Sequence, residues 1–347
     1  MTERLPARRK LFGYLALALC CMFDCEAQTA ADDSSRLRPE IERFIGYMVQ
    51  THGFSARDLR VLFAKVQPNQ DVIKAMSAPS TAKPWYEFRP LFVDQARIVG
   101  GVRFWNDNGE VLAQARNEFG VPESIIVALI GVETRYGRNT GGFRVIDTLT
   151  TLAFDWPSRR DFFRRELEQF LLLAREQGWD PLAIKGSFAG ALGMPQFMPG
   201  SYRRYAIDYD KDGQIDLWRN APDVIGSVAS YLKEFGWKDG EPVVAPARVQ
   251  VADAQPLLDL GLKPSLTLDE WRARGADSTL ALPDSLLACV FSVDLAGGPE
   301  FWFGFDNFYA LLQYNRSRNY AMAIVELARE ITLERERLGT LPPAEPE

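Results

Sequence analysis

Residues 120–137, GVPESIIVALIGVETRYG, predict a strongly apolar helix, expected over residues 124–136. The residues of this stretch are apolar on nearly every side, which is typical of a helix that protein encloses on all faces. Glu133 ends the apolar run and shares a face with Ile126 and Leu129 at helical spacing. The stretch therefore predicts a helical core with one carboxyl group at its end.

The position of Glu133 predicts an unusual acidity. A carboxylate there is removed from water and lies near the negative end of the helix dipole, and both effects raise its pKa. A carboxyl group that stays protonated near neutral pH can act as a general acid and protonate a glycosidic oxygen. The alternative is a glutamate at the exposed end of a buried helix, paired with Arg135 or Arg138.

On either side of this helix the sequence predicts a mostly helical body. Two amphipathic helices are expected within residues 35–75, the second beginning after Ser55, where the pattern is that of a capping box. Further helices are expected at residues 103–119, between Ser158 and Gly178, at residues 223–235 and at residues 319–337. Residues 83–92 are aromatic and contain prolines, so we expect an ordered loop there.

A change of composition near residue 239 predicts a small β-containing region. Residues 240–300 are rich in Pro, Gly and Val, and strands are expected at residues 243–244, 249–251 and 287–293. The turn residues Gly297-Gly298-Pro299 can fold residues 287–295 back onto residues 301–305 as a hairpin. The predicted fold class is therefore mainly α, in the α+β class.

The composition excludes several kinds of enzyme site. His52 is the single histidine of 347 residues, so no site built from several histidines is possible. Only Cys289 lies beyond the first 25 residues, which excludes cysteine-based metal sites and disulfide frameworks from the main body. The glycine patterns of dinucleotide-binding and P-loop proteins are absent. The net charge of −6 argues against a nucleic-acid-binding protein.

The N-terminus predicts export. Residues 4–10 hold four basic side chains, and the apolar run at residues 11–23 is too short to span a bilayer but suits a signal peptide. Residues 25–27, CEA, resemble a cleavage site. The alternative is lipoprotein processing at Cys20 or Cys21, which the preceding residues match poorly. We expect an exported, periplasmic protein. The alternative is a protein attached to the outer membrane, and a lipid anchor is the one means of attachment that the sequence offers.

A glycine-rich stretch at residues 186–199, GSFAGALGMPQFMP, predicts a loop that approaches a ligand closely. Its glycines and prolines resist regular helix formation. Ser187 and Gln196 can hydrogen-bond an acetamido group, while Met194 and Phe197 offer apolar contact. The alternative is a loop with a structural role alone.

Residues 208–216, DYDKDGQID, contain the first half of an EF-hand loop. The carboxylates at its positions 1, 3 and 5 are those of Asp208, Asp210 and Asp212. Position 12 is Arg219 instead of Glu, and Asp223 can supply the missing carboxylate if the loop is longer. We expect a structural Ca²⁺ because oxygen ligands are numerous and no nucleophile is adjacent; a solvated acidic loop is the alternative.

Together with residues 314–320, YNRSRNY, these features resemble in their order the membrane-bound lytic murein transglycosylase B family, glycoside hydrolase family 103. The matching stretches are residues 120–137, 185–202, 208–218, 225–237 and 308–322. The resemblance implies a lysozyme-like helical catalytic core. It also implies cleavage of the β-1,4 bond between N-acetylmuramic acid and N-acetylglucosamine of peptidoglycan, which leaves 1,6-anhydromuramoyl ends.

The resemblance also implies roles for particular residues. Glu133 matches the single catalytic acid and base of the family. The positions that line the glycan groove match Ser187, Gln196, Tyr231, Tyr314, Asn315 and Tyr320. The calcium loop matches Asp208, Asp210, Asp212, the carbonyl group of Gln214, and Asp223. The resemblance thus implies a structural Ca²⁺ and no cofactor for catalysis. It implies peptidoglycan glycan strands as the partner. Cell-wall synthesis enzymes are further candidate partners, and nucleic acid is not a candidate.

These features divide the chain into six expected segments. They are a signal peptide at residues 1–27, an N-terminal helical subdomain at 28–120, the lysozyme-like core with the calcium loop at 121–238, a small β-containing insertion at 239–305, a helical segment that completes the core and groove at 306–338, and a disordered tail at 339–347.

Two other functions remain as alternatives. Ordinary glycosidases use two carboxyl groups, so a lysozyme-type peptidoglycan hydrolase would need a second one, for which Asp147 and Asp155 are the candidates. The second alternative is a non-catalytic, calcium-stabilised glycan-binding protein, although a pure binding protein has no use for a desolvated carboxyl group at Glu133.

Overall fold

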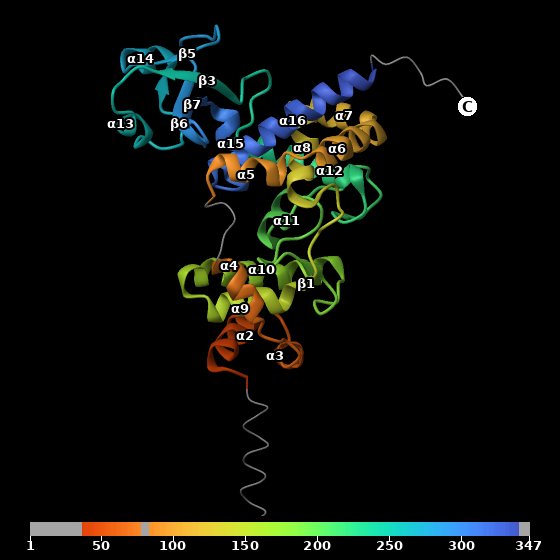
Figure 1. Ribbon diagram of the computed structural model, residues 1–347. Coiled ribbons are helices and arrows are strands. Elements are labelled where there is room, and N and C mark those ends of the chain that lie inside the picture. Colours follow the sequence, from red (N-terminus) through yellow and green to blue (C-terminus); the bar gives the residue numbers. More distant parts are fainter. Residues whose placement is uncertain (1–36, 78–82, 340–347) are drawn as a thin grey trace, which may run out of the picture. The chain divides into compact units, whose positions relative to one another are not determined.

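The computed structural model describes residues 37–77 and 83–339 (Figure 1). The predicted signal peptide lies outside this range, as does the predicted tail except for Gly339, which ends the last helix. The described residues are mostly helical with a small sheet region, which confirms the predicted fold class. Among them, no helix combines the length and the apolar character that crossing a bilayer requires.

The described residues up to Val66 form a compact unit of their own. In it, α2 (Pro39–His52) contacts α3 (Ala56–Phe63). The hydroxyl group of Ser55 accepts a hydrogen bond from the amide of Asp58 at 3.3 Å, so the predicted start of the second helix is confirmed.

The second unit begins at Gln67 and contains all other described elements. Its helices are α4 (Gln70–Ser77), α5 (Trp85–Phe92), α6 (Gln95–Asp107), α7 (Gly109–Phe119), α8 (Glu123–Thr134), α9 (Val145–Asp155), α10 (Arg160–Gln177), α11 (Pro199–Tyr205), α12 (Ala221–Glu234), α13 (Gln255–Leu258), α14 (Leu268–Ala273), α15 (Asp306–Tyr314) and α16 (Arg318–Gly339).

Helix α8 is the predicted apolar helix, and protein surrounds it. Residues 125–132 are all buried. Helices α6, α7, α12 and α16 contact α8 and enclose it (Figure 1). Glu133, which follows this run, is half-buried, and it is the one ionisable residue among residues 124–134.

The prediction of a loop at residues 83–92 is wrong. This segment forms α5, in which Trp85 and Phe88 are buried and their rings lie 6.2 Å apart. Pro90 lies inside the helix. The burial of the two large aromatic side chains stabilises one short helical stretch despite the hydrogen bond that the proline cannot donate.

The helices before and after α8 also differ from the prediction. Residues 103–119 are not one helix, because Asn108 has a non-helical φ of −126° and donates its side-chain amide to Phe104 O at 2.8 Å, which separates α6 from α7. Helix α4 is a third helix where two were expected. The sequence also predicts no element at residues 145–155, where the structure has helix α9.

A five-stranded antiparallel sheet has the strand order β4-β6-β7-β3-β5. The strands are β3 (Val244–Val249), β4 (Leu266–Thr267), β5 (Ala276–Ser278), β6 (Leu287–Leu295) and β7 (Gly298–Gly304). The predicted hairpin is confirmed, with Phe291 opposite Trp302. The separate strands predicted at residues 243–244 and 249–251 are wrong, since one strand, β3, runs from the first of these segments into the second.

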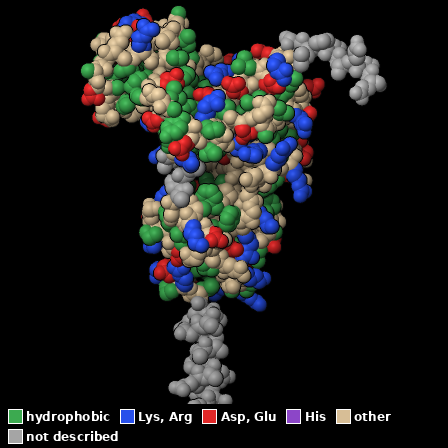
Figure 2. Space-filling model, viewed as in Figure 1, with side chains coloured by type: hydrophobic (Ala, Val, Ile, Leu, Met, Phe, Trp, Pro, Cys, Tyr) green, Lys and Arg blue, Asp and Glu red, His purple; other side chains and the backbone are tan. Residues whose placement is uncertain are grey.

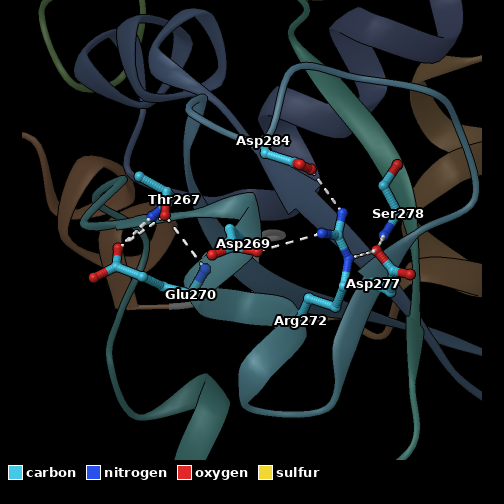
Figure 3. A network of polar contacts seen from close by, with 7 residues as sticks. All are labelled: Thr267, Asp269, Glu270, Arg272, Asp277, Ser278 and Asp284. Atoms are coloured by element: carbon cyan, nitrogen blue, oxygen red, sulfur yellow. Dashed lines mark hydrogen bonds and ion pairs between the residues drawn. The ribbon is translucent and has the colours of Figure 1, made fainter.

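Acidic and basic side chains are interspersed over the face of the molecule in Figure 2. Figure 3 shows one network of this kind beside the sheet. The guanidinium group of Arg272 contacts the carboxylates of Asp269, Asp277 and Asp284 at 3.4, 3.2 and 2.7 Å. One ordered arginine side chain therefore joins α14 to β5 and to the loop before β6, although each exposed pair alone contributes little.

Candidate active site

Glu133 is the last but one residue of α8, at a sharp reversal of the chain. Arg135 and Tyr136 both have positive φ, 52° and 61°, a conformation that costs a non-glycine residue about 1–2 kcal/mol. The hydroxyl group of Tyr136 donates to Arg97 O at 2.8 Å, and its ring stacks on Phe104 at 5.6 Å. These contacts hold the reversal in place and so fix the direction in which the Glu133 side chain leaves the helix.

Among the described residues, one side chain is hydrogen-bonded to the carboxyl group of Glu133, that of Tyr320 on α16. The hydroxyl group of Tyr320, which is buried, donates a hydrogen bond to Glu133 Oε1. Burial raises the pKa of Glu133 from 4.5 to about 7, and the hydrogen bond from Tyr320 opposes this rise because it stabilises the carboxylate. Arg135 lies near Asp94 instead, at 3.8 Å, and no ion pair joins Glu133 to a basic residue in the described part of the chain.

An aromatic cluster lies beside this carboxyl group. The rings of Tyr231 and Tyr314 lie 4.7 Å apart, and that of Phe197 lies 5.4 and 5.8 Å from them. The hydroxyl group of Tyr314 donates to Pro195 O. Burial raises the pKa of both tyrosines, and the charge of Glu133 raises it further.

The glycine-rich loop at residues 186–199 is fastened to the end of α8. The hydroxyl group of Thr134 donates to Met194 O at 2.9 Å. Gly193 has a φ of 68°, and a Cβ atom there would lie 2.6 Å from Leu217 O, so the loop can follow this path only with glycine. Thr134 is a further residue of the site that the sequence pattern does not predict; its one signal in the sequence is its place directly after the predicted acid, Glu133.

Two predicted ligand-binding residues of this loop, Ser187 and Gln196, form hydrogen bonds with the backbone of the loop, and Gln196 also with that of Thr140. The Ser187 hydroxyl group accepts hydrogen bonds from two backbone amides of its own turn, at 3.0 and 3.3 Å. The Gln196 side-chain amide donates to two carbonyl groups at 2.8 and 3.2 Å. Phe197 is only 2% exposed and packs against the two tyrosines, so it offers no free apolar face. Asn315, by contrast, is exposed at the end of α15.

The three carboxylates of the EF-hand pattern come together. One oxygen each from Asp208, Asp210 and Asp212 lies within 4.8 Å of the other two. The amide of Gly213 donates to Asp208 at 2.8 Å, and that of Gln214 donates to Asp212 at 2.8 Å, so the backbone of the loop orients these side chains. An all-oxygen group of this kind fits a hard cation such as Ca²⁺.

Asp223 lies outside this group of three carboxylates. It is fully buried in the first turn of α12, and its two oxygens accept the backbone amides of Tyr209 and Asp216 at 2.8 Å each. Asp223 therefore holds the two ends of the acidic loop together.

Comparison with known proteins gives consistent results. Residues 36–329 match the transglycosylase SLT domain family. Membrane-bound lytic murein transglycosylase B of Escherichia coli (strain K12) is 40% identical over 307 residues, which are 86% of this chain and 84% of the relative.

Two solved structures extend this comparison. The soluble lytic transglycosylase SltB1 from Pseudomonas aeruginosa is 48% identical, with a TM-score of 0.81 over 86% of this chain and 100% of that one. The Escherichia coli lytic transglycosylase Slt35 in complex with calcium is 39% identical, with a TM-score of 0.79 over 86% of this chain and 94% of that one.

Proposed function

The chain belongs to the transglycosylase SLT domain family and is a lytic transglycosylase of peptidoglycan, and on this premise we propose that Glu133 is its single catalytic acid and base. The observation that carries the proposal is the environment of this carboxyl group. It is desolvated at the end of an apolar helix, and a buried tyrosine hydroxyl group fixes it. A pKa of about 7 gives comparable populations of acid and base at neutral pH.

One carboxyl group can perform both proton transfers of the reaction. Protonated Glu133 donates its proton to the glycosidic oxygen, and the bond from that oxygen to the muramoyl anomeric carbon breaks. The 2-acetamido oxygen of the muramoyl residue stabilises the resulting oxocarbenium ion. The Glu133 carboxylate then removes the proton of the 6-hydroxyl group, whose oxygen bonds to the anomeric carbon. Glu133 ends protonated, as it began, and no water is consumed.

The surroundings of Asp147 support a mechanism with one carboxyl group. As the candidate second carboxylate of a hydrolase, Asp147 would have to face the substrate. Instead, its two oxygens accept hydrogen bonds from the guanidinium group of Arg144 at 2.7 and 2.8 Å. One guanidinium group therefore engages both oxygens of this carboxylate, so neither oxygen is free to face a substrate.

The mass of the reaction products tests this mechanism. Purified peptidoglycan incubated with the full chain is expected to yield muropeptides that are lighter by one water than their hydrolysed counterparts, because the 6-hydroxyl group replaces water as the nucleophile. Mass spectrometry of the released fragments, with a lysozyme digest for comparison, measures this difference. Fragments of full hydrolysed mass would contradict intramolecular attack and would require a second carboxylate.

A structural Ca²⁺ is part of the proposal. The carboxylates of Asp208, Asp210 and Asp212 would hold the ion, and their proximity supports this because three close negative charges repel one another without a cation. When bound, the ion supplies charge neutralisation to the loop between α11 and α12. The C-terminal end of this loop is hydrogen-bonded to the glycine-rich loop, because the amide of Met194 donates to Leu217 O at 2.7 Å.

Calcium is therefore expected to raise the melting temperature of the protein. At a concentration one hundred times the dissociation constant the rise should be about 5 °C, and EDTA should reverse it. The Asp210→Asn variant should lose this response, whereas Asp107→Asn, a change at an exposed carboxylate on α6, should keep it. Differential scanning calorimetry measures the shift, and equal melting temperatures of the wild type in Ca²⁺ and in EDTA would refute the site.

The proposed partner is the glycan strand of peptidoglycan, and cell-wall synthesis enzymes are proposed as further partners. Since peptidoglycan lies outside the cytoplasm, the enzyme acts there. We place it in the periplasm, by export with the signal peptide proposed at residues 1–27. Lipid attachment at Cys20 or Cys21 is the alternative form.

A further inference from the structure

A cavity of about 710 Å³ lies beside the turn that joins α15 to α16. Its volume is in the range of sites that bind small molecules or short peptides, about 300–1,000 Å³. It is lined by Lys83, Pro84, Leu262, Asp294 and every residue of the turn at 315–319. Asn315 is the one lining residue that the family resemblance also assigns to the glycan groove.

The turn places this cavity next to the catalytic carboxyl group. The tyrosines on either side of it are fixed in the site, since Tyr320 donates to Glu133 and Tyr314 donates to Pro195 O. The turn itself is held by internal hydrogen bonds, from the amide of Ser317 to Asn315 at 3.2 Å and from the amide of Tyr320 to Ser317 at 3.3 Å. A ligand in the cavity is therefore one short turn away from the reaction centre.

The opposite walls come from other parts of the fold. Asn319 is 7% exposed and donates its side-chain amide to Lys83 O at 2.9 Å, which ties the turn to the start of α5. Leu262 and Asp294 belong to the β-containing region, Asp294 to strand β6. The β-containing region thus supplies one side of a cavity whose other side belongs to the catalytic turn.

The charge of the lining is mainly positive. Lys83, Arg316 and Arg318 line the cavity together with one acidic residue, Asp294. Arg318 lies 3.8 Å from Asp294, and both side chains are about half exposed. This ion pair is therefore weak, and another anion can replace Asp294 as the partner of Arg318. Arg316 forms no ion pair with any residue that the structure describes.

We propose that this cavity binds the carboxylates of the peptide stem carried by the muramoyl residue. The inference rests on the proposed function, since it names a further part of the same substrate. The muramoyl lactyl group carries a peptide with free carboxylates, and arginine guanidinium groups bind carboxylates through two parallel hydrogen bonds. Asn315, which the resemblance assigns to the glycan groove, lines the cavity, and the positive lining complements the carboxylates of the stem.

The test compares two substrates with one pair of substitutions. Glycan strands with intact stems, and the same strands after an amidase has removed the stems, are cleaved by the wild type and by the Arg316→Gln/Arg318→Gln variant. We expect kcat/KM of the variant to fall about tenfold on strands with stems and to stay unchanged on bare strands. Removing a cation from the N-terminus of α16 does not oppose the helix dipole, so the variant should fold.

A matched control is Arg329→Gln, a change at an exposed arginine of the same helix that lies outside the cavity. Stems whose carboxylates are amidated give an independent readout, on which wild type and double variant should be equal. Unchanged activity of the double variant on both substrates overturns the proposal, and so does an equal loss on both, which would assign the arginines to the sugars. A wild type inactive on both substrates would instead refute the proposed function.

Discussion

The Glu133→Gln variant is expected to lose at least about a thousandfold in kcat while it still binds glycan strands. General acid–base catalysis by one side chain contributes about 10²–10⁴ in rate, and Glu133 serves both proton transfers in the proposed mechanism. Glutamine has nearly the same shape and can still accept the hydrogen bond from Tyr320. The loss should therefore lie in turnover and not in folding or in binding.

Glu123→Gln provides the matched control for this prediction. Glu123 lies in the first turn of the same helix, 3.7 Å from Arg116, and is far from the reversal at the other end. The same chemical change there should leave kcat within a factor of about two. Release of soluble fragments from peptidoglycan measures turnover, and pull-down with insoluble peptidoglycan measures binding. Near-normal turnover of Glu133→Gln would remove it from the catalytic role.

Local sequence was sufficient to predict the buried helix that carries Glu133. A run that is apolar on all faces predicts burial by itself, because no other arrangement removes so many apolar side chains from water. The desolvation of Glu133 follows from its place at the end of that run, and the structure attributes its raised pKa mainly to desolvation. The three carboxylates of the acidic loop are equally local, since residues two positions apart in one turn lie close together.

Contacts between distant segments could not be derived from periodicity. Tyr320 lies 187 positions from Glu133, and only the resemblance to a known family placed it in the groove. The same limit applies to Phe197, whose burial depends on two tyrosines from other helices. Asp223 accepts hydrogen bonds from the amides of residues 14 and 7 positions earlier. No helical or strand periodicity indicates contacts at these separations.

The raised pKa of Glu133 also predicts how stability depends on pH. The pKa is about 7 in the folded protein, against 4.5 for an unperturbed glutamate. Between these values the folded state holds a proton that the unfolded state has lost, so the free energy of unfolding falls as pH rises. The stability is fully present below pH 4.5 and is lost as pH rises through 7, by at most about 3 kcal/mol.

Glu133→Gln has no proton to lose at this position, so its stability relative to wild type should increase by up to about 3 kcal/mol from about pH 4 to about pH 8. Urea unfolding of both proteins across this range measures the difference. In Tyr320→Phe, the hydrogen bond that lowers the pKa of Glu133 is gone, so its loss of stability should continue to higher pH than in wild type. Parallel stability curves for wild type and Glu133→Gln would mean that the carboxyl group is solvated in the folded protein. In that case Glu133 would be kept protonated only in the complex with substrate, because the bound substrate excludes water from the groove.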